Sequence, residues 1–440
     1  MGNFFREHRV LNRVIRIVCL MVIGLIVAHL FLAERNVYWQ DAGFVSMSTW
    51  LKVRFYVPDK QAVGPAVRLV QNTCYEISDM CNVFNPESEL ARLNATAYRE
   101  PFRCSEKLWE MLTAARKWYK LSGGAFDISI GPLMKLWGFR SMEKHLPSPE
   151  EIAAAKKLVG LDKVVFNDAD RSVRFTVEGM SLDLGGIAKG ASLDLTAARA
   201  AETSFAGTER WEDAPFMKRA DAWFKRKRAR LNRGFIDFGG NVLALPEPPP
   251  DGKAYRAGVR NFFSEHGKPC AYISLLDECV STSASYERYV VLNGRRYSHI
   301  IDPVSGRPVE DMLSVTVVAK HGIDADALST AIFVKGKAFA EQMKKEMPEI
   351  KVLMYYSEPG NPEKIHSFTL GDGWEDVTIP VELPEPSAAE RSVPVLSPAA
   401  PPSAPASSAA SSSAGESVPS SAPAASSSAS GSSAGASGNH

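Results

Sequence analysis

The chain has 440 residues, and its 51 Lys and Arg against 50 Asp and Glu give a formal net charge of +1. With 45% hydrophobic and 23% charged residues, it has the composition of a globular protein that buries a core, and its length allows two or three domains. The balanced charge argues against a dedicated nucleic-acid binder, whose surface would be strongly basic. Six scattered cysteines without a CxxC pair argue against a disulfide scaffold or a zinc finger.

Residues 17–33 form an apolar run without a formal charge, in which His29 is the most polar side chain. As a helix the run would span about 25 Å, the short end of what crosses a bilayer. Arginines precede it, so the positive-inside rule keeps the N-terminus in the cytoplasm and exports the rest of the chain. We predict a cytoplasmic basic segment and a transmembrane anchor over residues 1–36, with the folded part exported across the membrane. A cleaved signal peptide is the alternative, for which a small-residue cleavage site is missing.

Residues 37–385 carry the patterns of a folded domain in which strands and helices are mixed without regular alternation. Residues 51–57 alternate as a strand, and residues 66–80 have helical spacing. Residues 105–121 predict a helix with Ser105 as its N-cap and Gly123 after its end. This mixture favours an α+β fold over a doubly wound parallel sheet. Further strands are predicted at residues 163–166, 173–177, 235–238, 271–275, 288–292 and 313–319.

Two segments differ in composition from this domain. After residue 396 the chain is almost entirely Ala, Ser, Pro and Gly, and we predict a disordered tail over residues 386–440. Residues 200–233 look inserted and end in a stretch with eight basic residues and one acidic residue. That insertion is interpreted either as a patch for anionic headgroups or an acidic partner, or as a solvated amphipathic helix.

The first candidate site motif is GGAFD at residues 123–127, which directly follows the predicted helix. Paired glycines let the backbone approach a ligand closely, and Phe126 and Trp137 are candidates to stack on a planar ring. The competing interpretation is a helix C-cap followed by a turn and core aromatics.

The second motif is LDLGGIAKG at residues 182–190, a short predicted strand that leads into paired glycines and a helix. Backbone N–H groups, the helix dipole and Lys189 in the first turn all favour a phosphate there. The motif matches neither Walker A nor GxGxxG, so the pattern alone leaves the question open.

The third motif combines Thr282 and Ser283 with HIIDPVSG at residues 299–306. Ser283, His299 and Asp302 suggest a hydrolase triad. However, no GxSxG elbow surrounds the serine, and Asp302 is too near in sequence to orient the histidine. A structural histidine on a strand is the competing interpretation.

The fourth motif is DADALST at residues 324–330. Asp326 and Thr330 are four residues apart and share one face of a helix, and their carboxylate and hydroxyl suit a hard cation such as Mg²⁺. In the competing interpretation one of the aspartates is an N-cap and Thr330 bonds back to the helix.

Taken in this order, the four motifs resemble the ApbE family of FAD:protein FMN transferases. The resemblance also includes MST at residues 47–49 and NVFNPESEL at residues 82–90 with Asn94, and it covers residues 44–370. It implies an ApbE-like α+β fold with mixed or antiparallel sheets. It also implies a protein anchored in the inner membrane, with its folded part facing the periplasm or the cell exterior. It also implies Mg²⁺-dependent transfer of FMN from FAD to a Thr or Ser hydroxyl of a target protein, with AMP leaving.

The resemblance assigns roles to residues at matching positions of this sequence. His299 would help to deprotonate the acceptor hydroxyl. The Mg²⁺ ligands would be the backbone carbonyl of Gly186 and the side chains of Asp326 and Thr330. The FAD contacts would be Met47, Phe84, Ala125, Phe126, Asp127, Asp183, Lys189 and Ile300.

The same resemblance implies partners and leaves alternatives open. The expected acceptor is a membrane electron-transfer subunit or an exported flavin reductase, and no nucleic acid is expected. A Mg²⁺-dependent FAD pyrophosphatase that yields FMN and AMP, or a non-catalytic periplasmic FAD-binding protein, would use the same pocket. The chain departs from the family at Ala284 and Ser285, where the family usually has Gly after the Thr-Ser pair, and in the basic insertion at residues 200–233. We expect these departures to affect the turn and acceptor docking.

Overall fold

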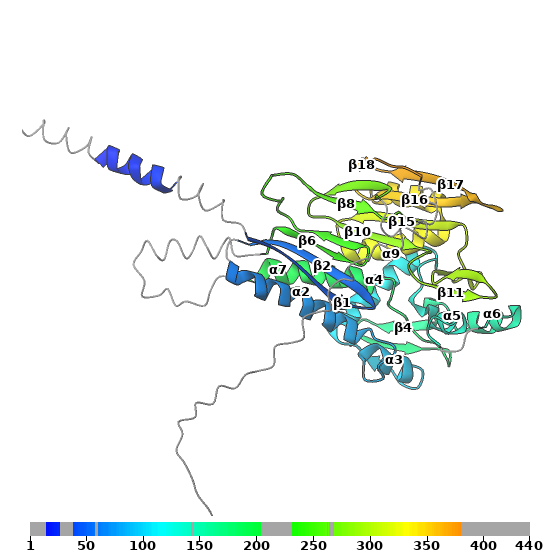
Figure 1. Ribbon diagram of the computed structural model, residues 1–440. Coiled ribbons are helices and arrows are strands. Elements are labelled where there is room, and N and C mark those ends of the chain that lie inside the picture. Colours follow the sequence, from blue (N-terminus) through cyan, green and yellow to red (C-terminus); the bar gives the residue numbers. More distant parts are fainter. Residues whose placement is uncertain are drawn as a thin grey trace, which may run out of the picture. The chain divides into compact units, whose positions relative to one another are not determined.

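A central antiparallel sheet organises the fold in the computed structural model (Figure 1), which describes residues 15–26, 38–57, 60–141, 145–203, 231–261, 263 and 268–379. The sheet has eight strands in the order β1-β2-β6-β7-β10-β15-β16-β17. These strands are β1 (Tyr38–Ser46), β2 (Thr49–Val57), β6 (Gly234–Phe238), β7 (Asn241–Ala244), β10 (Cys279–Ala284), β15 (Met312–Ala319), β16 (Lys351–Glu358) and β17 (Asn361–Leu370).

Alternation of apolar and polar side chains explains why β2 pairs in the register observed. Leu51, Val53 and Phe55 are buried, whereas Lys52 between them is exposed, so a slip by one residue would turn the apolar side chains to solvent. β2 pairs with β1 through a two-residue turn at Met47 and Ser48, both with positive φ (48° and 61°). This backbone conformation is unusual for residues other than glycine, and it places Met47 at the end of the hairpin.

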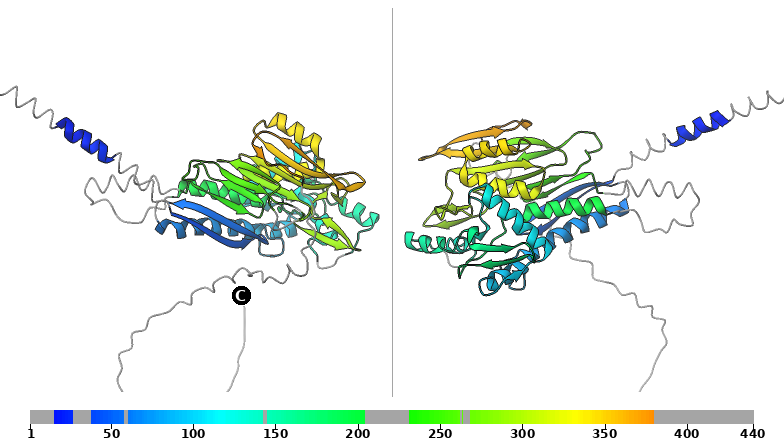
Figure 2. Two further views of the ribbon diagram at one scale, coloured as in Figure 1. Left: turned by 45° about the horizontal axis from the view of Figure 1, so that its top comes forward. Right: turned by 180° about the vertical axis from the view of Figure 1, so that it is seen from behind.

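Three helices, α2, α7 and α9, pack against the central sheet and against one another. α9 packs on β10 and β15, and α7 contacts both α9 and α2 (Figure 2, right). Leu328, Ile332 and Phe333 of α9 are fully buried with Val315 and Val317 of β15, and each large apolar side chain buried in this way contributes about 1.5–3 kcal/mol. The helices are α2 (Lys60–Met80), α3 (Glu89–Thr96), α4 (Glu106–Leu121), α5 (Gly131–Leu136), α6 (Pro149–Lys156), α7 (Ala188–Glu202), α9 (Gly322–Lys335) and α10 (Lys337–Glu346), with short 3-10 helices η1 (Ile128–Ile130) and η2 (Leu161–Lys163).

Smaller antiparallel sheets and hairpins complete the described fold. One three-stranded sheet has the order β18-β9-β8 and another β3-β5-β4, and the pairs β11-β12 and β13-β14 form two hairpins. These strands are β3 (Phe102–Arg103), β4 (Val164–Asn167), β5 (Ser172–Phe175), β8 (Tyr255–Val259), β9 (Ala271–Leu275), β11 (Tyr289–Leu292), β12 (Arg295–Ser298), β13 (Ile301–Asp302), β14 (Arg307–Pro308) and β18 (Trp374–Glu375). The α+β prediction is confirmed, with antiparallel pairing between the named strands.

The predicted helix at residues 66–80 begins earlier than expected, at Lys60. Pro65 lies inside α2, and a proline normally marks a boundary because it removes one helical hydrogen bond. Here Ala62, Val63 and Ala66 are buried in the same cluster, so packing of this face outweighs the missing bond. The predicted helix at residues 105–121 is confirmed, because Ser105 caps α4 by accepting a hydrogen bond from the Leu108 N–H.

Several terminal and inserted segments were predicted from composition, and most of their residues lie outside the described ranges. Helix is described over residues 15–26, which overlap the first part of the N-terminal apolar run. Across the part of the chain that the structure describes, no helix combines the length and apolar character needed to cross a membrane. Residues 27–37, most of the basic insertion (204–230) and the tail from residue 380 are outside the description. The boundaries predicted at 36, 200–233 and 385 therefore stay predictions.

Candidate active site

One large cavity brings together residues from many separate stretches of the chain, from Met47 to Thr330. Its volume is about 810 Å³, near the upper end of the roughly 300–1,000 Å³ typical of ligand pockets. All twelve residues predicted from the sequence line it: Met47, Phe84, Ala125, Phe126, Asp127, Asp183, Gly186, Lys189, His299, Ile300, Asp326 and Thr330.

Residues 182–184, just before α7, are held by hydrogen bonds from outside any sheet. A short strand was expected here, and the structure corrects that expectation: residues 181–184 belong to no strand. The side-chain amide of Asn94 takes the place of a neighbouring strand, because its Oδ1 accepts from the Leu182 N–H (2.7 Å) and its Nδ2 donates to the Leu182 carbonyl (2.9 Å). The Asp183 N–H donates to the carbonyl of Ile128 (2.7 Å). These bonds fix Asp183 at the cavity wall.

Arg140 is a cavity residue that sequence reasoning missed. Its guanidinium donates to the Asp183 carboxylate at 2.6 Å and lies over the Phe84 ring, 5.3 Å from the ring centre. Both groups of the ion pair are largely buried, and Asp183 also accepts from the Gly185 N–H. Arg140 thus joins two predicted ligand contacts, but no motif in the sequence marks it.

The GGAFD segment follows α4 as a capped turn, as the competing interpretation held. Gly123 and Gly124 have positive φ (59° and 85°), and the Ser122 hydroxyl accepts from the Phe126 N–H. Asp127 accepts from the backbone and the hydroxyl of Ser129, and burial raises its pKa. The turn nevertheless directs residues 125–127 to the cavity.

Of the two aromatic candidates for stacking on a ligand, Trp137 is instead a core residue, as the competing interpretation held. Its side chain is buried beside Tyr297, with ring centres 5.3 Å apart, and its Nε1–H donates to the Gly306 carbonyl. Trp137 is therefore a core residue with a satisfied polar atom. Sequence alone could not separate it from Phe126, because both are aromatic residues in the same stretch after the paired glycines.

Helices α7 and α9 cross at two glycines, and this crossing builds the centre of the site. A Cβ on Gly190 would lie 2.1 Å from the carbonyl oxygen of Gly322, so only glycine permits the observed approach. The crossing allows the Gly190 N–H to donate to Asp326 Oδ2 at 3.0 Å. Asp194 of α7 accepts from the first N–H groups of α9, at Gly322 (2.7 Å) and Ile323 (2.8 Å).

We expect Gly190→Ala to destabilise the protein by about 1–3 kcal/mol or more, because a methyl group cannot fit between two backbones. Urea denaturation of both proteins measures the change. Gly64→Ala in α2 is the matched control, since its Cβ would meet only the mobile end of Arg68; it should be neutral or stabilising by up to about 1 kcal/mol. Equal stability of Gly190→Ala and the parent would contradict the crossing.

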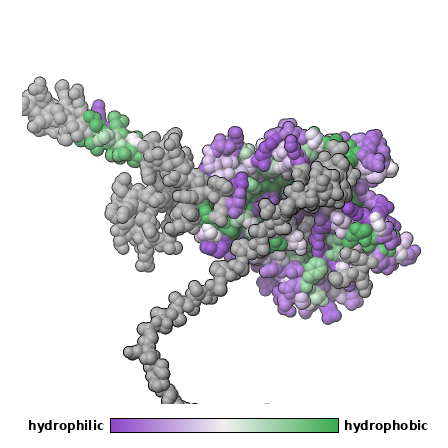
Figure 3. Space-filling model, in the orientation of Figure 1, coloured by the Kyte–Doolittle hydropathy of each residue, from purple (hydrophilic) through white to green (hydrophobic). Residues whose placement is uncertain are grey.

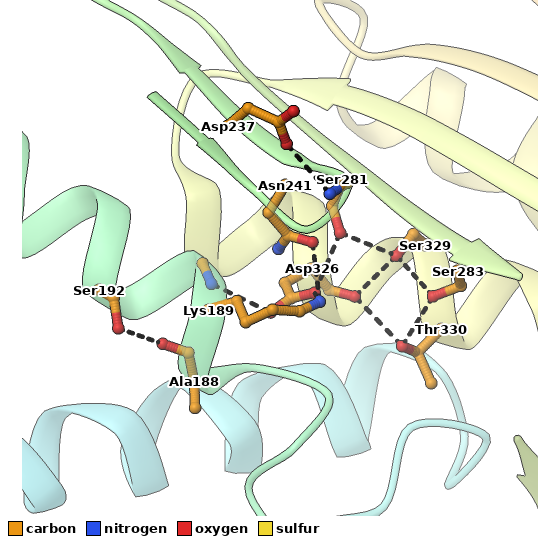
Figure 4. A network of polar contacts seen from close by, with 12 residues as sticks. Ala188, Lys189, Ser192, Asp237, Asn241, Ser281, Ser283, Asp326, Ser329 and Thr330 are labelled. Carbon is orange, nitrogen blue, oxygen red and sulfur yellow. Dashed lines mark hydrogen bonds and ion pairs between the residues drawn. The ribbon is translucent and has the colours of Figure 1, made fainter. Parts of the chain in front are cut away.

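Asp326 lies at the centre of a buried polar network (Figure 4). Its Oδ1 accepts from the Ser281 hydroxyl at 3.0 Å and lies 3.7 Å from the Lys189 ammonium. Neither aspartate of the fourth motif is the helix N-cap, because His321 has that position and Asp194 supplies the capping carboxylate. The N-cap alternative is therefore wrong.

Thr330 extends the network toward the cavity. Its hydroxyl donates to the Asp326 carbonyl at 3.3 Å, as the competing interpretation expected, and lies 3.2 Å from the Ser283 hydroxyl (Figure 4). Gly186 faces the same place from the loop before α7: a Cβ there would be 3.3 Å from Phe126 and 3.5 Å from the Thr330 hydroxyl. One carboxylate, one hydroxyl and a nearby backbone segment form a set of oxygen donors of the kind that hard cations prefer. Among the described residues, no three His, Cys, Asp or Glu side chains group as metal ligands.

His299 lies in a bend between β12 and β13, not on a strand as expected. Its Nδ1 is 3.0 Å from the Arg288 carbonyl. Because a carbonyl only accepts, Nδ1 carries the proton and Nε2 keeps its lone pair. Burial, helped by the Arg288 and Lys189 charges and opposed by Asp183, lowers the His299 pKa to about 4. The imidazole is therefore neutral at pH 7.

The triad of Ser283, His299 and Asp302 is not assembled. The Asp302 carboxylate accepts from the backbone N–H groups of Val304 and Ser305, which closes the turn between β13 and β14. The Ser283 hydroxyl is directed to Ser329 and Thr330. The rejection of a triad on sequence grounds agrees with this geometry.

We expect Arg288→Met to raise the pKa of His299 above its value of about 4, since removal of the guanidinium charge removes one cause of the depression. The His299 Nδ1–H bond should persist because its acceptor is a backbone carbonyl. NMR titration of the imidazole Cε1–H signal measures the pKa directly. An unchanged pKa would show that the Arg288 charge does not contribute to the depression.

The cavity has the features of a site for a large phosphorylated ligand. Lys189 lies in the first turn of α7, its ammonium is 3.7 Å from the Asp326 carboxylate, and aromatic rings line the wall. The chain belongs to the ApbE family, whose profile matches residues 47–207 and 220–354.

Relatives with known names agree with this membership. The FAD:protein FMN transferase of Treponema pallidum is 32% identical over 284 residues, covering 61% of this chain and 71% of the relative. That of Klebsiella pneumoniae is 27% identical over 306 residues, covering 69% and 84%. The crystal structure of the ApbE protein from Thermotoga maritima has a TM-score of 0.60 at 27% identity and covers 75% of this chain and 96% of that one. The fold of the Vibrio cholerae flavin transferase ApbE is also similar, with a TM-score of 0.59 over 76% of this chain and 97% of that one at 22% identity.

Proposed function

We propose that this protein transfers FMN from FAD to a Thr or Ser hydroxyl of a target protein and releases AMP. The observation that carries the proposal is the convergence of all twelve predicted residues on one cavity, although they are spread from residue 47 to residue 330. The names of the relatives support the same activity.

In this proposal FAD occupies the cavity with its pyrophosphate near the start of α7. Lys189 and the N-terminal N–H groups of α7 supply positive charge for the phosphates. Phe126 and Phe84 offer ring faces, and Arg140 and Asp183 offer hydrogen-bonding groups.

The oxygen donors fit a Mg²⁺ ion, which would be held by the Gly186 carbonyl, the Asp326 carboxylate and the Thr330 hydroxyl. Asp326 is the charged member of the set, and its burial beside Ser281 and Gly190 fixes its orientation. When bound, the metal supplies neutralising charge to the pyrophosphate. The protein contributes the position of each donor.

His299 is proposed to accept the proton of the acceptor hydroxyl at Nε2, the nitrogen that the Arg288 carbonyl leaves free. The hydroxyl oxygen forms a bond to the FMN phosphorus while the bond from that phosphorus to the bridging oxygen breaks. The bridging oxygen and its electron pair leave with AMP. The flavin is then joined to the target by a phosphoester.

The test incubates the full chain with FAD, Mg²⁺ and a candidate acceptor protein, and follows flavin by in-gel fluorescence and products by chromatography. Flavin bound covalently to the acceptor, with one AMP released for each, is the expected result. Free FMN with an unmodified acceptor would instead make the protein an FAD pyrophosphatase. FAD that stays intact would make it a flavin carrier.

We further propose that the folded part is exported and anchored in the inner membrane by the N-terminal run. Exposed apolar side chains of the described helix at residues 15–26 support an anchor; Leu20 and Leu25 are 67% and 69% exposed (Figure 3). The acceptor would then be a membrane electron-transfer subunit or an exported flavin reductase. Protease treatment of spheroplasts measures the orientation, and digestion of the folded part only after lysis would contradict it.

A further inference from the structure

Protein donors surround the Asp326 carboxylate within the described part of the chain (Figure 4). Oδ2 accepts from the Gly190 N–H and Oδ1 accepts from the Ser281 hydroxyl, each at 3.0 Å. The Lys189 ammonium lies 3.7 Å from Oδ1, and the Asp326 side chain is only 4% exposed. A buried carboxylate requires a compensating charge, and Lys189 supplies it here.

Asn241 determines where the Lys189 ammonium lies. Nζ donates to Asn241 Oδ1 at 2.8 Å, which is a full hydrogen bond. Its distance of 3.7 Å to Asp326 is too long for one. The asparagine, at the start of β7, therefore holds the ammonium just short of direct contact with the carboxylate.

The orientation of the Asn241 amide is fixed by charge. The residue is 1% exposed, and its Nδ2 has no hydrogen-bond partner among the described residues. Turning the amide over would place that N–H₂ group against an ammonium, with donors facing donors. An unpaired buried amide is unfavourable, so its presence points to a role for Oδ1.

We propose that Lys189 is the resident cation of Asp326, and that Asn241 is a positioning residue that keeps Lys189 ready to move from the carboxylate to the phosphates of FAD. The divalent cation and Lys189 would then exchange places when cation and FAD bind together. This inference rests on the proposed function and adds a binding order to it. Without FAD, the divalent cation binds weakly because Lys189 already neutralises the Asp326 carboxylate. Coupling of this kind typically amounts to about 5–150-fold in affinity.

The first test measures Mn²⁺ binding to the full chain without FAD, using the electron paramagnetic resonance signal of free Mn²⁺. Lys189→Met should tighten Mn²⁺ binding by about tenfold or more, because a positive charge close to Asp326 is removed. Lys52→Met is the matched control, since Lys52 also lines the cavity but its charge acts on Asp237; its Mn²⁺ affinity should change little. Unchanged or weaker binding in Lys189→Met would overturn the proposal.

The second test examines Asn241 through Lys189. Asn241→Leu should weaken Mn²⁺ binding several-fold, because the released ammonium completes its ion pair with Asp326. In the double variant Lys189→Met/Asn241→Leu, the affinity should equal that of Lys189→Met alone, since Asn241 acts through the lysine. A merely structural role would weaken binding equally in both backgrounds, which would overturn the assignment. Asn241→Ser serves the same comparison if the leucine variant does not fold.

Asp326→Asn in the same titration separates two kinds of failure. If it abolishes Mn²⁺ binding while Lys189→Met has no effect, the cation site stands and the resident-cation proposal is wrong. If it leaves Mn²⁺ binding unchanged, the cation site of the proposed function is wrong, and the inference falls with it. The flavin-transfer assay is read independently of both.

Discussion

Asp326→Asn should reduce flavin transfer by about 10³-fold or more, the largest loss that we expect from a single substitution. The change removes the formal charge of the proposed cation site while it keeps the shape of the side chain. The Ser281 hydroxyl retains an acceptor at Oδ1. Initial rates of AMP release, measured over a range of Mg²⁺ concentrations, test this expectation.

The matched control is Asp324→Asn, two residues earlier on the same helix. Its carboxylate accepts from Trp118 Nε1 and from Lys117 of α4, and it does not line the cavity. This variant should keep the parent's turnover and Mg²⁺ dependence, although it can lose stability. If Asp326→Asn behaves like Asp324→Asn, the cation lies elsewhere.

His299→Gln should slow transfer by about 10²–10⁴-fold while FAD binding remains close to that of the parent. The reason is that the proposed base acts on the acceptor hydroxyl and not on the cofactor. Single-turnover transfer from bound FAD, combined with a fluorescence titration of FAD, separates the two effects. His321→Gln is the control, because His321 is exposed at the start of α9.

The pKa of His299 also predicts the direction in which the transfer rate changes with pH. Since the His299 pKa is lowered to about 4, the base is unprotonated across neutral pH, and its protonation should reduce the rate only as the pH falls toward 4. An unperturbed histidine would instead lose activity around pH 6.5. A rate for His299→Gln equal to the parent's would leave the histidine with only a structural role.

Local patterns predicted the elements of this fold well. The strand at residues 51–57 and the helix capped by Ser105 depend on neighbours a few positions away, which periodicity and capping rules describe. The helical spacing of Asp326 and Thr330 likewise placed both on one face of α9, and both line the cavity.

Long-range polar partners could not be predicted in the same way. Asn94 pairs with Leu182, Arg140 with Asp183, and Asn241 with Lys189 across separations of 88, 43 and 52 residues. A single asparagine or arginine leaves no periodic signal, so nothing in one sequence indicates which backbone or charge it will meet. For this reason the predicted site contained the cavity residues but not Arg140 or Asn241, and Asn94 entered only as part of the family pattern, without a role.

The residues that line the cavity are spread along the chain from Met47 to Thr330, and this spread has a consequence for the order in which the site is synthesised. Helix α9 begins at Gly322, and it both carries Asp326 and fills the space against α7, β10 and β15. A nascent chain that has reached residue 320 therefore has the lysine, the glycine loop and the histidine, but it lacks Asp326 and the helix that packs on α7, β10 and β15. Such non-local contacts form late. An unfinished polypeptide of this length therefore lacks the charged member of the proposed cation site, and synthesis of α9 completes the site.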